Sequence, residues 1–244
     1  MEAKTCLVKK KILFVGDSTN RGMMYYLMQK INGSLHQWEK THSMKVYSSA
    51  LNDDQTSVSF AYFPQFWLPS YRKPDFLKAL HHLMAKFMPL YNSTDTILVV
   101  GGVQWLRPSH VTAIKSTLIS LGLSGIKVII KTLGSGFHLP VPGVVELDSE
   151  GQMKVSRRNE LLIKTSVAAG FEVIDTHTMT ITRYKEFLTG KCGCHFHKVV
   201  DLKSHSKEVV DILRDEQKNG HPRYHVLGSI NSAYSDIMIS RMCS

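Results

Sequence analysis

The chain has 244 residues, of which 43% are hydrophobic and 20% charged, the proportions of a packed globular protein rather than a disordered one. Its length suits one sizeable α/β domain, so we expect residues 1–244 to form a single domain. The net charge of +10 is scattered along the chain, without arginine clusters interleaved with aromatic residues. We therefore expect a merely basic surface and no nucleic-acid partner.

The first part of the chain predicts a strand, a sharp turn and a helix. Residues 12–15 are four consecutive apolar residues, which is typical of a buried strand, and Gly16, Asp17 and Ser18 form the turn. A helix is expected from Asn20 onward, with apolar residues at helical spacing up to residue 31. Next come an alternating strand at 58–63, a loop rich in proline and aromatic residues at 64–69, and a helix at 75–90.

The later part of the chain continues this alternation. The predicted elements are a strand in the apolar run 96–102, a helix at 111–121, a strand at 127–131, a helix at 156–169, a strand at 171–175 and a closing helix at about 229–242. Residues 185–223 show no regular pattern.

Strands that alternate with helices indicate right-handed βαβ units. The predicted fold class is therefore α/β, a three-layer α/β/α sandwich around a mainly parallel sheet. Ligands of such sheets bind beyond the carboxyl ends of the strands. The loops after Val15, Val100 and Lys131, together with Asp175 at the end of the fourth strand, are the expected site.

Ser18 stands at the expected strand-to-helix turn, where backbone N–H groups and the helix dipole favour negative charge. This position suits a nucleophile, but a serine there is also a common helix N-cap. A phosphate site is less favoured, because the glycines match neither a Walker loop nor a dinucleotide fingerprint.

The four cysteines allow either two disulfides or free thiols. Cys192 and Cys194 stand close to His195 and His197, but zinc ligands are usually spaced more widely, so no metal is predicted. We expect this cysteine pair to form disulfides instead, with Cys6 and Cys243 as candidate distant partners.

Two tripeptides, Asn32-Gly-Ser34 and Asn92-Ser-Thr94, match the N-glycosylation pattern and favour a secretory setting. The first residues are too polar for a signal peptide, so the chain is either cytosolic or a piece of a longer secreted protein. No apolar run approaches the ~18–20 residues that span a bilayer, and no membrane span is predicted.

Several stretches together resemble the PC-esterase branch of the SGNH-type hydrolases. They are residues 14–22 (FVGDSTNRG), 62–67 (YFPQFW), 99–105 (VVGGVQW), 129–134 (IIKTLG), 136–140 (GFHLP), 183–188 (RYKEFL), 191–197 (KCGCHFH), 224–226 (YHV) and 240–243 (SRMC). The resemblance covers nearly the whole chain. It implies a flavodoxin-like fold, the C-terminal part of a longer chain, and a place in the secretory pathway, either the endoplasmic reticulum or outside the cell.

The resemblance also implies an activity and a set of site residues. The family adds or removes O-acyl groups, usually acetyl, on glycans or glycoproteins. No cofactor is expected for this chain. Ser18 matches the nucleophile and Asp17 precedes it in the Gly-Asp-Ser block. Gly102-Val103-Gln104 matches the family's Gly-x-Asn, so Gly102 and the amide of Gln104 are the candidate oxyanion donors.

The sequence departs from the family pattern at the base. No Asp-x-x-His occurs in the chain, and we expect His225, rather than His221, to serve as the base. Asp175 or Asp215 would supply the orienting carboxylate. The chain also lacks a glycine between Gly33 and Gly101 for the second oxyanion donor. Two hypotheses follow: an O-acyl esterase or acyltransferase, and a catalytically inactive extracellular or lumenal module that retains the fold.

The aromatic loop at residues 63–67 allows two interpretations. Its rings either form the floor of a sugar-binding site by stacking or pack as part of the core and rim of the domain.

Overall fold

In a computed structural model, the chain is described at residues 3–33, 35, 38, 42, 44–47, 51–135, 148–183, 186–187, 195–201 and 224–244. The described strands are β1 (Lys11–Gly16), β2 (Lys45–Tyr47), β3 (Ser57–Tyr62), β4 (Thr96–Gly101), β5 (Lys127–Lys131), β6 (Glu172–Ile174), β7 (Lys198–Asp201) and β8 (Tyr224–Leu227). The described helices are α1 (Ala3–Cys6), α2 (Ser18–Asn32), the 3₁₀ turn η1 (Ser70–Arg72), α3 (Phe76–Lys86), α4 (Pro108–Ser120), α5 (Ser149–Ala168), α6 (Thr176–Ile181) and α8 (Ser229–Cys243).

Six strands form one sheet in the order β2-β3-β1-β4-β5-β6. Among the described strands of this sheet, β3, β1, β4, β5 and β6 are parallel to one another, and the edge strand β2 runs antiparallel to its neighbour β3. Numbered along the chain, the parallel strands lie in the order 2-1-3-4-5, which is the flavodoxin-like arrangement. The strand order reverses between β1 and β4, and this is the switch point at which such sheets bind ligands.

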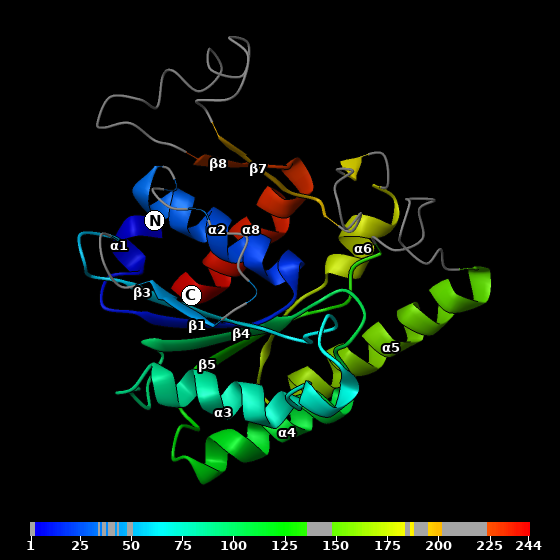
Figure 1. Cartoon of the computed structure of the whole chain (residues 1–244), viewed down its shortest axis with the longest axis horizontal. Helices are drawn as coiled ribbons and strands as arrows, with labels where there is room; N and C mark the ends of the chain where they lie inside the picture. The colour runs from blue at the N-terminus through cyan, green and yellow to red at the C-terminus, as the bar shows by residue number, and fades with distance from the viewer. Residues whose placement is uncertain are drawn as a thin grey trace.

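Helices cover both faces of the sheet (Figure 1). Helices α1, α2 and α8 lie on one face, and α3, α4 and α5 lie on the other. Each face has its own apolar cluster, one centred on side chains of α2 and α8, the other on side chains of α3 and α4. The central strands β1 and β4 are almost wholly buried, which explains their continuous apolar sequence. The predicted three-layer α/β/α fold is confirmed.

Several element boundaries differ from the predicted ones for local reasons. Helix α3 ends at Lys86, because Pro89 disfavours helical backbone at the residue before it. Helix α5 begins at Ser149, seven residues earlier than predicted, because the side chain of Asp148 caps it through the N–H of Gly151. The short helix α6 was not predicted.

Strands β7 and β8 form a separate antiparallel ribbon that packs on α2. It lies beyond the α2 and α8 layer, away from the main sheet (Figure 1). The N–H of Val226 donates to Gln29 Oε1 at 2.6 Å, which ties β8 to α2. Periodicity did not predict either strand.

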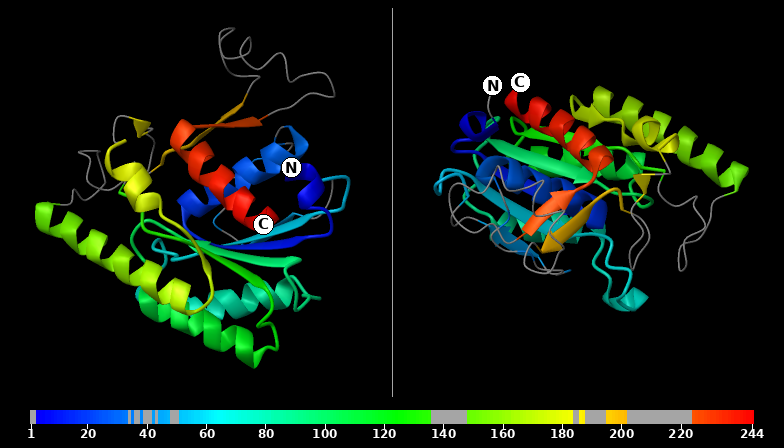
Figure 2. Two further views of the ribbon diagram at one scale, coloured as in Figure 1. Left: turned by 180° about the vertical axis from the view of Figure 1, so that it is seen from behind. Right: turned by 90° about the horizontal axis from the view of Figure 1, so that it is seen from above.

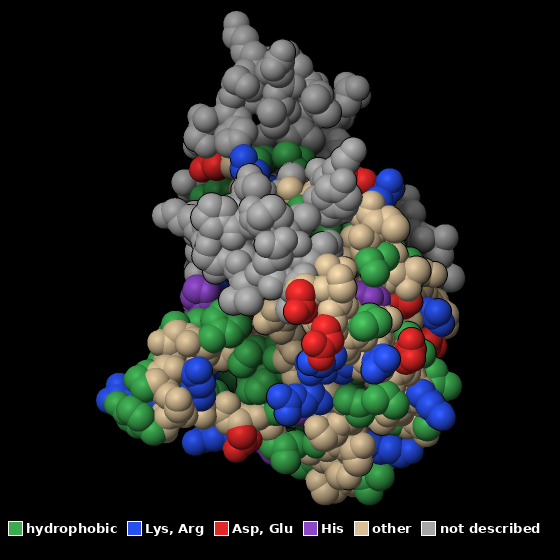
Figure 3. Space-filling view, turned by 90° about the vertical axis from the view of Figure 1, so that its right-hand side faces the viewer, with side chains coloured by type: hydrophobic (Ala, Val, Ile, Leu, Met, Phe, Trp, Pro, Cys, Tyr) green, Lys and Arg blue, Asp and Glu red, His purple; other side chains and the backbone are tan. Residues whose placement is uncertain are grey.

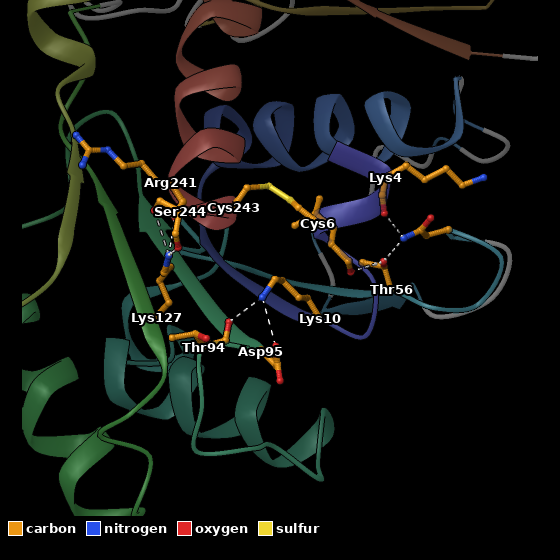
Figure 4. Close-up of a disulfide and its surroundings, with 12 residues drawn as sticks. Lys4, Cys6, Lys10, Thr56, Thr94, Asp95, Lys127, Arg241, Cys243 and Ser244 are labelled. Atoms are coloured by element: carbon orange, nitrogen blue, oxygen red, sulfur yellow. Dashed lines mark hydrogen bonds and ion pairs between the residues drawn. A yellow bond between two sulfur atoms is a disulfide. The ribbon is translucent and has the colours of Figure 1, made fainter. Parts of the chain in front are cut away.

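The two ends of the described chain lie side by side (Figure 2). Cys6 of α1 forms a disulfide with Cys243 of α8, with 5.6 Å between their Cα atoms (Figure 4). Nearby, the Lys127 ammonium donates to the carbonyl groups of Arg241 and Ser244. The suggestion that Cys6 and Cys243 pair with Cys192 and Cys194 is therefore wrong. The latter two lie outside the described residues.

Within the described residues, no helix combines the length and apolar character that a bilayer crossing requires.

Candidate active site

The turn between β1 and α2 is organised by the carboxylate of Asp17. This buried side chain is the N-cap of α2, where its Oδ1 accepts from the N–H of Thr19 at 2.9 Å and from Thr19 Oγ1 at 2.7 Å. Its Oδ2 accepts from the N–H of Val103, in the loop after β4, at 2.8 Å. Asp17 therefore joins the Gly-Asp-Ser turn to the Gly-Gly loop, and Ser18 follows as the first residue of the helix.

Glycine is required in the loop after β4 because other groups lie where a side chain would begin. A Cβ on Gly102 would lie 2.0 Å from Trp105 Nε1 and 2.6 Å from Asp17 Oδ2. Gly102 thus permits the contact of the two loops, which is a role in packing that its residue type alone does not reveal.

The histidine beside Ser18 is His195. Its Nε2 lies 2.6 Å from Ser18 Oγ, within hydrogen-bonding distance. His195 precedes β7, so the segment that leads into the β7–β8 ribbon carries the ring over the N-terminus of α2. A serine hydroxyl beside an imidazole nitrogen is the arrangement that activates a nucleophile. In the sequence, this histidine is marked only by its place in the Cys-Gly-Cys-His-Phe-His segment.

The predicted base, His225, lies elsewhere. It is 1% exposed, in the middle of β8, and faces Val200 across the ribbon. The ring nitrogen within hydrogen-bonding distance of Ser18 Oγ belongs to His195. The structure therefore brings Ser18 together with His195 rather than with His225. His221 lies outside the described residues.

The other predicted site residues are the oxyanion donor Gln104 and the two candidate orienting carboxylates. The Gln104 side chain is exposed, and the backbone carbonyl of Gln104 accepts from Arg158 Nη1. The role of the Gln104 side-chain amide as an oxyanion donor stays a prediction. Asp175, a candidate orienting carboxylate, caps α6 by accepting from the N–H groups of His177 and Thr178. The alternative, Asp215, lies outside the described residues.

A buried lysine at the end of β5 stands behind the turn. Lys131 is 2% exposed, and its Nζ donates to Thr19 Oγ1 at 2.9 Å and to the carbonyl of Gly102 at 3.4 Å. The same ammonium lies 5.8 Å from the ring centre of Tyr234. Since Thr19 donates in turn to Asp17, a chain of hydrogen bonds links a buried cation to the buried carboxylate. The sequence offered only one signal for this residue, a charge that ends an apolar strand.

His197 packs behind His195, with 4.8 Å between the ring centres. Burial is the main reason that the pKa of His197 is well below its usual value, and the neighbouring His195, Arg21 and Lys131 lower it further. The ring fits against α2 only because residue 22 is glycine, since a Cβ there would lie 2.4 Å from His197 Nδ1. His197 is thus held neutral and fixed beside the histidine that contacts Ser18.

An aromatic cluster lies at the edge of this site. Tyr62 ends β3 beside Gly16, and the guanidinium of Arg21, one turn beyond Ser18, lies 5.5 Å from its ring centre. The ring of Trp67 lies 4.9 Å from Tyr62 and is 44% exposed, and Phe66 is 58% exposed. In the view of the carboxyl edge of the sheet, apolar side chains gather around a hollow beside basic side chains (Figure 3).

One solved structure with a similar chain is described as the lipase/acylhydrolase from Enterococcus faecalis. The two chains are 15% identical, and the match covers 88% of this chain and 98% of that chain with a TM-score of 0.43.

The family model described as NXPE family member 4-like, C-terminal domain, matches residues 1–123, which include the Gly-Asp-Ser turn and the Gly-Gly loop. This match confirms the predicted resemblance to an SGNH-like, esterase-type domain. The chain belongs to the NXPE family, within its member 4-like C-terminal domain.

Proposed function

We propose that the domain is a serine-dependent O-acyl esterase or acyltransferase that acts on acyl groups, such as acetyl, carried by glycans. Ser18 is the nucleophile and His195 is the general base. The observation that carries the proposal is the 2.6 Å contact between Ser18 Oγ and His195 Nε2.

The reaction proceeds in two stages. His195 Nε2 takes the proton as Ser18 Oγ attacks the acyl carbonyl carbon, and a tetrahedral intermediate forms. Its collapse breaks the ester bond, and the departing sugar oxygen takes the proton from His195. The acyl group then passes from Ser18 to water in an esterase, or to a second hydroxyl in an acyltransferase, with His195 again moving the proton.

The negative oxygen of the intermediate is stabilised at the N-terminus of α2. The first N–H groups of a helix have no acceptor within it, and those of Ser18 and Thr19 are among them. Asp17 occupies the N–H of Thr19, which leaves the N–H of Ser18 as the nearest donor. The backbone N–H of Gly102 and the side-chain amide of Gln104 are the proposed further donors. The N–H of Val103 is not among them, because it donates to Asp17.

The aromatic cluster supports a glycan as the carrier of the acyl group. Trp67 and Phe66 present exposed ring surface next to the strand that ends beside Gly16. The C–H faces of sugar rings pack well on such rings, and the partly exposed cluster gives a carbohydrate a place to lie while its ester reaches Ser18.

The alternative is an inactive module that keeps the fold and the aromatic surface for binding. It is favoured by the absence of Asp-x-x-His from the sequence and by the use of Asp175 as the cap of α6. A histidine without its orienting carboxylate loses up to ~10⁴-fold in rate in serine proteases.

Labelling with a fluorophosphonate probe separates the two functions, because such probes react only with activated serines. We expect Ser18→Ala to abolish labelling and His195→Ala to slow it by about 10²–10⁴-fold. His225→Ala serves as the matched control and keeps labelling within a few-fold of the wild type. Absence of labelling in well-folded wild-type protein refutes the enzyme, and equal losses in the two histidine variants refute His195 as the specific base.

The disulfide between Cys6 and Cys243 fits an oxidising compartment. We propose that the domain works in the secretory pathway, within the endoplasmic reticulum or outside the cell, as one unit of a longer protein.

A further inference from the structure

An exposed asparagine stands beside an apolar groove on the side of the sheet opposite to Ser18. Asn92 lies in the connection between α3 and β4, and begins the tripeptide Asn92-Ser93-Thr94. The groove has a volume of about 540 Å³ and lies between the C-terminal ends of α3 and α4, near the amino ends of β4 and β5. Its lining includes Met84, Met88, Leu90, Asn92, Leu121 and Leu123.

The side-chain amide of Asn92 accepts a hydrogen bond through its oxygen. The N–H of Gly125 donates to Asn92 Oδ1 at 2.6 Å. Because only the oxygen of an amide accepts a hydrogen bond, this contact fixes which end of the side chain is the nitrogen. The contact does not use Nδ2, the atom to which an N-linked glycan attaches, and it survives attachment because the carbonyl is unchanged.

The other matching tripeptide is in a different setting. Asn32 is the last residue of α2 and only half exposed, and its Oδ1 accepts from the N–H of Asn52 at 3.0 Å. Asn52 is itself 2% exposed and donates to the carbonyl of Lys4 and to Thr56 Oγ1. Asn32 therefore belongs to a packed junction, whereas Asn92 lies on the surface.

The surroundings of Asn92 are unusually apolar for an exposed loop. Met88 is 63% exposed and Leu121 44%, and both line the groove. Contiguous apolar surface of this kind is uncommon on a protein that nothing covers. Sugar rings bring apolar C–H faces together with outward hydroxyls, so a glycan attached at the rim of the groove covers these side chains and remains solvated.

We propose that Asn92 is N-glycosylated and that the first sugars of its glycan lie in the groove between α3 and α4. In the attachment step, Nδ2 attacks C1 of a sugar carried on a polyprenyl diphosphate, the new C–N bond replaces the C1–O bond to the diphosphate, and one amide proton leaves to a base of the transferase. This site does not depend on the proposed esterase activity, and it leaves the carboxyl edge of the sheet open.

Mass spectrometry tests the attachment. The full chain is secreted from mammalian cells behind a signal peptide, and its intact mass is compared before and after treatment with peptide N-glycosidase. We expect a glycan that is absent from Asn92→Gln and Thr94→Ala but retained in Ser93→Ala, which keeps the tripeptide pattern, and in Asn32→Gln. Secreted wild-type protein without a glycan, or a glycan that remains in Asn92→Gln and disappears from Asn32→Gln, overturns the proposal.

Binding of an apolar fluorescent dye tests where the glycan lies. Asn92→Gln exposes the groove, so dye fluorescence rises above that of the wild type, and adding Met88→Ser reverses the rise. Asn32→Gln is the control and leaves the fluorescence unchanged. Equal fluorescence of folded wild-type and Asn92→Gln protein overturns the placement of the sugars in the groove.

Discussion

Replacing Asp17 by alanine measures how strongly one carboxylate holds the two loops of the site together. The change removes a helix cap, which costs about 1 kcal/mol. It also leaves the buried N–H of Val103 without its charged acceptor, which costs about 1.5–3 kcal/mol. Relief from burying a carboxylate offsets part of this sum. We expect a loss of about 3 kcal/mol in the free energy of unfolding, or roughly 6–12 °C in Tm for a chain of this size.

Asp75 provides the matched control. It caps α3 through a single hydrogen bond from the N–H of Lys78 and lies at an exposed position. Asp75→Ala should cost only about 1 kcal/mol. The difference of about 2 kcal/mol between the two variants, measured by urea denaturation, isolates the link from Asp17 to Val103. Asp17→Asn keeps the cap but sets an NH₂ group against the N–H of Val103. Its loss in the free energy of unfolding should therefore still exceed that of Asp75→Ala by most of that difference of about 2 kcal/mol. Equal losses in Asp17→Ala and Asp75→Ala would show that the link contributes nothing.

Three further changes test other features. Replacing Cys6 and Cys243 together by serine should lower the free energy of unfolding by about 2–5 kcal/mol, because the disulfide closes nearly the whole chain; a urea midpoint equal to the wild type contradicts this. Burial lowers the pKa of His197, so below pH ~6.5 the unfolded chain binds more protons than the folded chain. The free energy of unfolding should therefore decrease, as the pH is lowered through this range, by up to ~1.4 kcal/mol per pH unit. Urea titrations at pH 5, 6 and 7 should show a shallower fall in His197→Phe, and an unchanged slope would disprove the assignment. Gly102→Ala should reduce fluorophosphonate labelling at least tenfold, because a 1 Å shift of a site loop costs ~100-fold; normal labelling would show that the loop accommodates the methyl group.

The layers of the fold were predictable because each central element carries its own signal. Strands β1 and β4 are continuous apolar runs, and such runs are buried on both faces of a parallel sheet. The turn at Asp17 and Ser18 was predictable for the same local reason, since glycine and capping residues follow directly after an apolar strand.

The partner of Ser18 was not predictable in this way. His195 lies 177 residues further along the chain, in a stretch without periodicity, and it reaches the site only because the β7–β8 ribbon docks on α2. The two nearby cysteines, Cys192 and Cys194, are typical of a disulfide or a metal site and do not indicate a catalytic base. The family pattern instead predicts a base closer to the C-terminus. Lys131 was missed because its charge becomes informative only when the loops that surround it are known.

The bond between Cys6 and Cys243 also determines how the domain carries mechanical load. Its two Cα atoms are 5.6 Å apart although 237 positions separate them in the sequence. A force applied through the polypeptide on either side passes across this covalent link, and neither the sheet nor the contact of His195 with Ser18 lies in its path. The oxidised domain therefore acts as a short inextensible joint, whereas its reduced form places the whole folded chain under tension.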